Sequence, residues 1–111
     1  MKARDYVLDA ISYLERIVRY TVDGHDTFLE DERTQDAVIR AYEVIGEIAK
    51  RLPQDVRENA PEIDWRKIIG FRDFLAHNYN EVILDFVWNA VEDAPRLMTL
   101  LKNLLTLFPE A

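Results

Sequence analysis

Apolar residues recur at intervals of three and four along much of this chain, a spacing that places them on one face of an α-helix. In residues 4–22 the stripe comprises Val7, Ala10, Ile11, Leu14, Ile17 and Val18. In residues 34–52 it comprises Ala37, Val38, Ala41, Ile45, Ile48, Ala49 and Leu52. The alternation of apolar and polar residues that is typical of a strand does not occur. The pattern therefore predicts an all-α protein.

Two further helices are expected in the second half of the chain. One begins at Trp65 and carries Ile68, Ile69, Phe71, Phe74 and Leu75. The other spans about residues 82–107 and carries Phe86, Val87, Val91, Leu97, Leu100, Leu101, Leu104 and Leu105. Four main helices with short connections predict an antiparallel four-helix bundle, with short extra helical turns after Thr27 and over residues 54–59.

Residues that favour helix ends suggest where these helices begin. Thr27 and Glu30 have the spacing of a capping box, in which each side chain bonds the other residue's backbone. Thr34 is the expected cap of the second long helix, and Asp64 that of the helix beginning at Trp65. Each of these side chains can accept a hydrogen bond from a backbone N–H group that the first turn leaves unpaired.

Two residues inside predicted helices are unusual there. Pro95 should kink the last helix, because it removes the backbone hydrogen bond to Val91. Gly46 lowers helix stability, so the close approach of another helix is its expected reason. The sequence leaves open whether that neighbour belongs to the same bundle or to a second copy of the chain.

Composition narrows the class of protein. The 111 residues contain no cysteine, so disulfides and thiolate metal sites are excluded and a reducing cytoplasm is the expected location. We expect one domain over residues 1–111, with neither a signal peptide nor a membrane span. The net charge of −7 argues against a protein that coats nucleic acid by bulk electrostatics, although it permits a nuclease with a small basic cleft.

The most informative segment is residues 72–79, which reads RDFLAHNY. Arg72 offers a planar cation that can hold two phosphate oxygens. His77 can exchange a proton near neutral pH, and Asp73 lies one helical turn before it, where it could orient the imidazole. Tyr79 supplies a hydroxyl that could accept a modification. The predicted site is therefore catalytic Arg72 and His77, with Asp73 in support and no metal or cofactor.

The spacing R-x4-H-x-Y resembles that of HepT-like proteins of the HEPN superfamily. The likeness extends over nearly the whole chain, through RTQDAV at 33–38, IGEIAKRL at 45–52, PEIDWRKIIG at 61–70 and VWN at 87–89. Ile83 departs from the pattern, because an aspartate often begins the last helix in this family.

The resemblance implies a small helical homodimer that acts as the toxin of a toxin–antitoxin pair. Such toxins are metal-independent RNA endonucleases, so RNA is the expected substrate and neither DNA nor a membrane is an expected partner. The antitoxin would be a minimal nucleotidyltransferase that silences the toxin by attaching AMP to the motif tyrosine, here Tyr79.

The spacing of Arg72 and His77 raises a geometric difficulty. Positions five apart on an ideal helix differ by roughly 140° around its axis. Either the helix unwinds near His77, or two chains contribute to one cleft. Two other functions stay open. One is a catalytically silent module that binds a nucleotide or a nucleotidyltransferase, and the other is a purely structural dimeric bundle.

Other polar and aromatic residues are expected to be structural. His25 is read as a solvated loop histidine, and Glu30, Asp31 and Glu32 as a solvated face. Trp65 and Trp88 are read as core or interface anchors. Four cations, Lys50, Arg51, Arg66 and Lys67, are expected on the solvated surface, with a smaller chance that they border an RNA groove.

Overall fold

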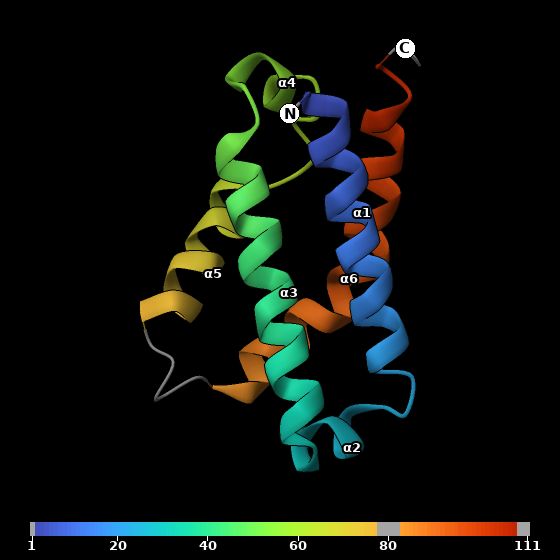
Figure 1. The fold of residues 1–111 in the computed structure, drawn as a ribbon, viewed down its shortest axis with the longest axis vertical. Coiled ribbons are helices and arrows are strands. Elements are labelled where there is room, and N and C mark those ends of the chain that lie inside the picture. The colour runs from blue at the N-terminus through green and yellow to red at the C-terminus, as the bar shows by residue number, and fades with distance from the viewer. Residues whose placement is uncertain (1, 78–82, 109–111) are drawn as a thin grey trace.

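The computed structural model describes residues 2–77 and 83–108, and the regular elements in those two ranges are all helices (Figure 1). In chain order they are α1 (Ala3–Tyr20), α2 (His25–Glu30), α3 (Glu32–Arg51), α4 (Gln54–Glu58), α5 (Trp65–His77) and α6 (Leu84–Leu105). The all-α prediction is confirmed. Among the described residues, no helix has the length and apolar character needed to cross a membrane.

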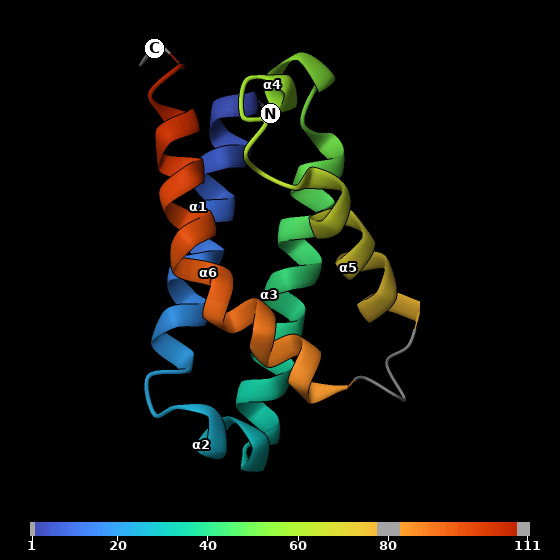
Figure 2. The same ribbon diagram turned by 180° about the vertical axis from the view of Figure 1, so that it is seen from behind.

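The four long helices alternate in direction, as an antiparallel bundle requires (Figures 1 and 2). The central helix α3 packs against α1 on one side and α5 on the other, while α6 packs mainly along α1. The short helices α2 and α4 lie at opposite ends of the bundle. In this arrangement α5 has one main neighbour, α3, and much of its surface is left uncovered.

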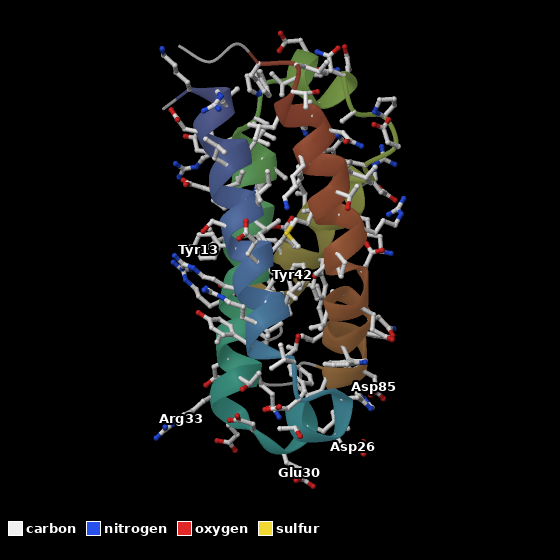
Figure 3. All side chains as sticks on the ribbon, turned by 90° about the vertical axis from the view of Figure 1, so that its right-hand side faces the viewer. Tyr13, Asp26, Glu30, Arg33, Tyr42 and Asp85 are labelled. Carbon is white, nitrogen blue, oxygen red and sulfur yellow. The ribbon has the colours of Figure 1, made fainter. Side chains whose placement is uncertain are left out.

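Helix α6 bends near its middle, as Figure 2 shows. Its first half runs obliquely across the bundle, and its second half runs along α1. Pro95 lies inside the helix and has no N–H group to donate to the carbonyl of Val91, so the predicted kink is confirmed. At the same place the hydroxyl of the buried Tyr42, on α3, donates a hydrogen bond to the carbonyl of Ala90. Figure 3 shows Tyr42 inside the bundle.

Two of the predicted helix starts are wrong. Helix α2 begins at His25, before Thr27, because Gly24 turns the chain there with a φ of 91°. Helix α3 is capped by Asp31, whose carboxylate accepts hydrogen bonds from the backbone N–H groups of Arg33 at 3.1 Å and Thr34 at 3.4 Å. The hydroxyl of Thr34, the expected cap, instead donates to the Asp31 carboxylate at 2.8 Å. A carboxylate competes well for this position because its charge also suits the positive end of the helix dipole.

Helix α5 begins with the predicted cap, whereas α6 begins without a side-chain cap. The carboxylate of Asp64 accepts the backbone N–H of Lys67 at 3.0 Å, so it caps α5 as predicted. Ile83, which departs from the family pattern, stands at the start of α6 and makes no side-chain capping bond. The expected start of this helix at Val82 lies outside the described residues.

Candidate functional site

The candidate site is built where α5 crosses α3 at Gly46. A Cβ atom added to Gly46 would lie 2.7 Å from Cγ of Arg72 and 3.3 Å from the carbonyl oxygen of Ile68, and closer still to Cβ of Arg72. Gly46 is therefore glycine because the stem of Arg72 rests directly on the α3 backbone. The expected close approach at Gly46 is confirmed, and the approaching helix belongs to the same chain.

The guanidinium of Arg72 lies between two carboxylates. Its Nη1 is 3.1 Å from Oδ1 of Asp73, and its Nη2 is 3.4 Å from Oε2 of Glu47. Two more cations border this group, since Lys50 Nζ is 3.9 Å from Asp73 and Arg51 Nε is 3.3 Å from Glu47. Three positive and two negative charges give the cluster a net charge of +1 on an otherwise acidic protein. The Arg72 side chain is 28% exposed, so part of it can be reached from solvent.

His77 is the last residue of α5 and is exposed. Its Nδ1 lies 2.7 Å from the backbone carbonyl oxygen of Asp73, one turn earlier. Because a carbonyl oxygen can only accept a hydrogen bond, Nδ1 must carry the hydrogen in this contact. In the neutral ring the lone pair is then on Nε2, which is the atom available to take a proton from a substrate.

Asp73 has two separate contacts, and neither is the expected contact between its carboxylate and the imidazole of His77. The backbone carbonyl of Asp73 orients His77, whereas its carboxylate pairs with Arg72 and Lys50. From the sequence we had expected the Asp73 carboxylate, rather than its backbone carbonyl, to orient the imidazole of His77. The carboxylate is drawn to Arg72 because it is next to it in the chain and on the side that faces α3.

Helix α5 stays helical through His77, so unwinding before this residue does not bring Arg72 and His77 together. The two residues are positioned by one helix but point in directions roughly 140° apart. Tyr79, the expected modification site, lies outside the described residues. Within one chain, the structure thus places the Arg72 guanidinium and the His77 imidazole close along the helix but on different faces.

A polar groove of about 330 Å³ opens beside Arg72, between α1 and α3. Its walls include Tyr6 and Tyr13 from α1, and Glu43, Glu47 and Arg51 from α3. The pKa of Arg51 is raised above its ordinary value, mostly by a hydrogen bond with Tyr6 and next by one with Glu47. Arg51 therefore keeps its positive charge. Sequence reasoning missed the two tyrosines, although their spacing of seven residues places both on one side of α1. Tyr13 is labelled in Figure 3.

An apolar groove of about 420 Å³ lies on another side of α5, against α3 and α6. Aromatic rings form much of its lining, namely Tyr42, Phe71, Phe74 and Phe86. Phe74 and Phe86 meet edge to face with ring centroids 6.5 Å apart, and Phe86 is 53% exposed. This uncovered aromatic surface leads toward the end of α5 that carries His77.

The remaining candidates are structural. His25 is not a loop residue as expected, because it begins α2, stacks on Trp88 with centroids 5.2 Å apart, and lies 3.6 Å from the Asp85 carboxylate. Figure 3 shows Asp85 beside α2. The indole of Trp65 donates to the carbonyl of Arg57 at 3.0 Å, so both tryptophans anchor the fold as predicted.

Among the residues that the structure describes, no three acidic or histidine side chains cluster as metal ligands would.

Comparisons with known proteins match most of the chain, including the segment that holds Arg72 and His77. A family model described as ribonuclease HepT-like matches residues 10–104, a span that includes Arg72 and His77. A protein of Thermococcus cleftensis named "Probable ribonuclease HepT" is 42% identical over 96 residues, which cover 85% of this chain and 87% of that protein. A "Putative RNase" of Methanocaldococcus jannaschii is 37% identical over 89 residues, covering 79% and 74% of the two chains. No solved structure matches the chain.

Proposed function

Because the chain belongs to the ribonuclease HepT-like family of the HEPN superfamily, we propose that it is an endoribonuclease that needs no metal and acts as the toxin of a toxin–antitoxin pair. The observation that carries this proposal is the state of the two motif residues. Arg72 is a partly exposed, fixed cation, and His77 is exposed with its Nε2 atom free to take a proton.

In the proposed reaction, Nε2 of His77 removes the proton of an RNA 2′-hydroxyl. The oxygen O2′ then forms a bond to the adjacent phosphorus, and the bond from phosphorus to O5′ breaks. Arg72 stabilises the negative charge that the phosphoryl oxygens gain in the transition state. The leaving O5′ takes up a proton, so the products are a 2′,3′-cyclic phosphate and a 5′-hydroxyl.

A second copy of the chain would resolve the angle between Arg72 and His77. If two copies meet near the end of α5, Arg72 of one copy and His77 of the other can face the same phosphate. The leaving O5′ would take its proton from solvent, since the imidazole that accepts the O2′ proton lies on the opposite side of the phosphorus. The apolar groove along α5 supports this homodimer, because Phe86 and Ile83 leave an apolar surface exposed beside the motif.

Control of the toxin would act at Tyr79, two residues after His77 in the sequence. We propose that a minimal nucleotidyltransferase antitoxin attaches AMP to this hydroxyl. The added phosphate would compete with RNA for Arg72 and repel the incoming backbone. Tyr79→Phe should keep its toxicity and escape the antitoxin. Mass spectrometry after coexpression tests this, and neutralisation of Tyr79→Phe as complete as that of the wild type would reject it.

One observation favours a second candidate, a catalytically silent module that binds a nucleotide or a nucleotidyltransferase. Arg72 is already paired with Glu47 and Asp73, and these carboxylates would oppose an RNA phosphate. The two candidates are separated by incubating purified protein with RNA in EDTA. Ribonuclease activity predicts fragments that end in 2′,3′-cyclic phosphate and that are lost in His77→Ala. Equal products from the wild type and His77→Ala would mean a contaminant and would favour the silent module.

A further inference from the structure

Two consecutive residues of α3 determine where the Arg72 side chain lies. Gly46 supports its stem, and Glu47 holds one end of its guanidinium. We propose that Gly46 and Glu47 are positioning residues, which set the location and the direction of Arg72 for the reaction proposed above. The inference rests on that proposed function for its kinetic consequences, but the placement of Arg72 can be measured without it.

Gly46 sets the distance between α5 and α3. The atoms that a new Cβ would meet are Cβ and Cγ of Arg72 and the carbonyl oxygen of Ile68. These atoms belong to the backbone or to the fixed base of a side chain, so they cannot rotate out of the way as the tip of a long side chain can. A methyl group at this position must therefore push α5 away from α3 or turn Arg72 from its present direction.

Glu47 sets the direction of the guanidinium. Asp73 contacts Nη1 and Glu47 contacts Nη2, so each terminal nitrogen of the planar group has a carboxylate partner. The Asp73 contact is a hydrogen bond and the Glu47 contact is an ion pair, so with respect to the described residues at least three of the five N–H donors of Arg72 remain for a phosphate. A guanidinium whose plane is already fixed loses less freedom when a phosphate binds, and it meets the transition state in the correct orientation.

The same carboxylate should have opposite effects on binding and on turnover. The negative charge of Glu47 weakens the attraction of RNA to the cluster, whereas its contact with Nη2 aims Arg72 at the reacting phosphate. Removing the charge should therefore leave KM for RNA unchanged or lower it, while kcat falls because Arg72 loses its direction. A residue that served only the fold would not separate these two constants in this way.

Glu43 provides a matched control for Glu47. It lies one helical turn earlier on α3, lines the same polar groove and has a similar exposure, 29% against 39% for Glu47. Its carboxylate lies 4.0 Å from Nη1 of Arg40. Glu43→Gln and Glu47→Gln thus remove the same charge from the same face of α3, but only the second change removes a contact with Arg72.

The kinetic test compares these two variants as full-length proteins with a defined RNA. We expect Glu47→Gln to lower kcat by about 10- to 100-fold, in line with the loss caused by a misplaced catalytic group, and Glu47→Ala to lower it further. Glu43→Gln should keep kcat within about twofold and change KM in the same direction as Glu47→Gln. Equal kcat values for the two Gln variants, in a wild type that cleaves RNA, would overturn the inference and leave the proposed function standing.

A second pair of variants tests Gly46 against the other glycine of the α3–α5 region. Gly70 lies on α5, and an added Cβ there would meet no atom within 4 Å. Gly70→Ala should keep wild-type turnover, whereas Gly46→Ala should lose about as much kcat as Glu47→Gln. If Gly46→Ala retains full kcat, the role of Gly46 is rejected.

The placement of Arg72 has a readout that does not depend on cleavage. The Nε–H signal of Arg72, assigned by its disappearance in Arg72→Lys, should show restricted motion by NMR in the wild type and in Glu43→Gln. It should show increased motion in Glu47→Gln. If the wild type does not cleave RNA, the proposed function fails, and this measurement still decides the inference: equal motion in the two Gln variants rejects it.

Discussion

Helices α1 and α5 differ in how the rest of the protein holds them. Five residues of the 18-residue α1 are buried, namely Val7, Ala10, Ile11, Leu14 and Ile17. In the 13-residue α5 only Leu75 is buried, and its other large apolar residues are half covered. The position of α1 is set mainly by its buried apolar stripe. The position of α5 depends more on particular contacts, such as that of the Arg72 stem with Gly46. Among the four long helices, the candidate chemistry lies on the one with the fewest buried residues.

The largest expected effect concerns activity and should leave the core intact. Arg72→Ala and His77→Ala should each lower RNA cleavage by roughly 10²- to 10⁴-fold, equivalent to about 3–5 kcal/mol of barrier. Arg72→Ala keeps the Cβ atom that rests on Gly46, so the packing of α5 on α3 should survive. Single-turnover cleavage and thermal unfolding of each variant provide the measurement. Retained cleavage in either variant, in a preparation shown to be free of contaminating nuclease, would contradict its role.

A change in α1 should have the reverse outcome, a loss of stability. Leu14 is wholly buried, so Leu14→Ala should lower the free energy of unfolding by about 2–5 kcal/mol. Leu8, on the same helix but 36% exposed, is the matched control, and Leu8→Ala should cost well under half as much. Urea unfolding of the two variants measures the difference. Equal costs would show that burial does not distinguish the faces of α1.

The uncovered surface along α5 can be tested through assembly. If a second copy covers the apolar groove, Phe86→Ser should weaken self-association by about 2 kcal/mol, or roughly 30-fold in Kd. Val22 is 73% exposed and is not among the groove residues, so Val22→Ser should associate as the wild type does. Sedimentation over a range of concentrations provides the measurement. A wild type that is monomeric at micromolar concentration would rule out the shared cleft.

The smallest expected effect lies at the start of α3 and depends on pH. Hydrogen bonds from the side chain and then the backbone of Thr34 lower the pKa of Asp31 below its ordinary value. A lowered pKa means that the charged carboxylate stabilises the folded state. That contribution is full above about pH 4 and is lost as the pH falls through the lowered pKa. Asp31→Ala should lower Tm by about a few degrees at pH 7, while Glu32→Ala should not. A difference that stayed constant down to pH 2 would contradict the assignment.

The sequence predicted the elements of the fold well because the apolar stripes are regular. All four long helices, the short helix that follows Pro53 and the kink at Pro95 are found. The cap of α3 was wrong because Asp31 and Thr34 both have oxygen atoms that can cap a helix, and the start of α2 was wrong because the chain turns at Gly24, which has no side chain. These starts depend on the turn at Gly24 and on the charge of Asp31, and neither is visible in the hydrophobic pattern.

Candidate site residues could be chosen from the sequence, but their contacts could not. The motif spacing identified Arg72 and His77, and Gly46 signalled a close helix crossing. What rests on Gly46 could not be read from the sequence, because 26 positions separate it from Arg72. The pairing of Glu47 with Arg72 and the hydrogen bond from His77 to the Asp73 carbonyl likewise depend on the three-dimensional crossing of the helices.

The bend at Pro95 also divides α6 into two parts that should open at different rates. The carbonyl of Val91 lacks its usual helical donor, so the helix can open there without breaking that bond. The second half packs along α1, and its amide protons should exchange with solvent only when the whole bundle unfolds. The first half borders the apolar groove, and its amide protons should exchange through cheaper local openings. Hydrogen exchange along this one helix would therefore report separately on the core and on whatever covers the groove.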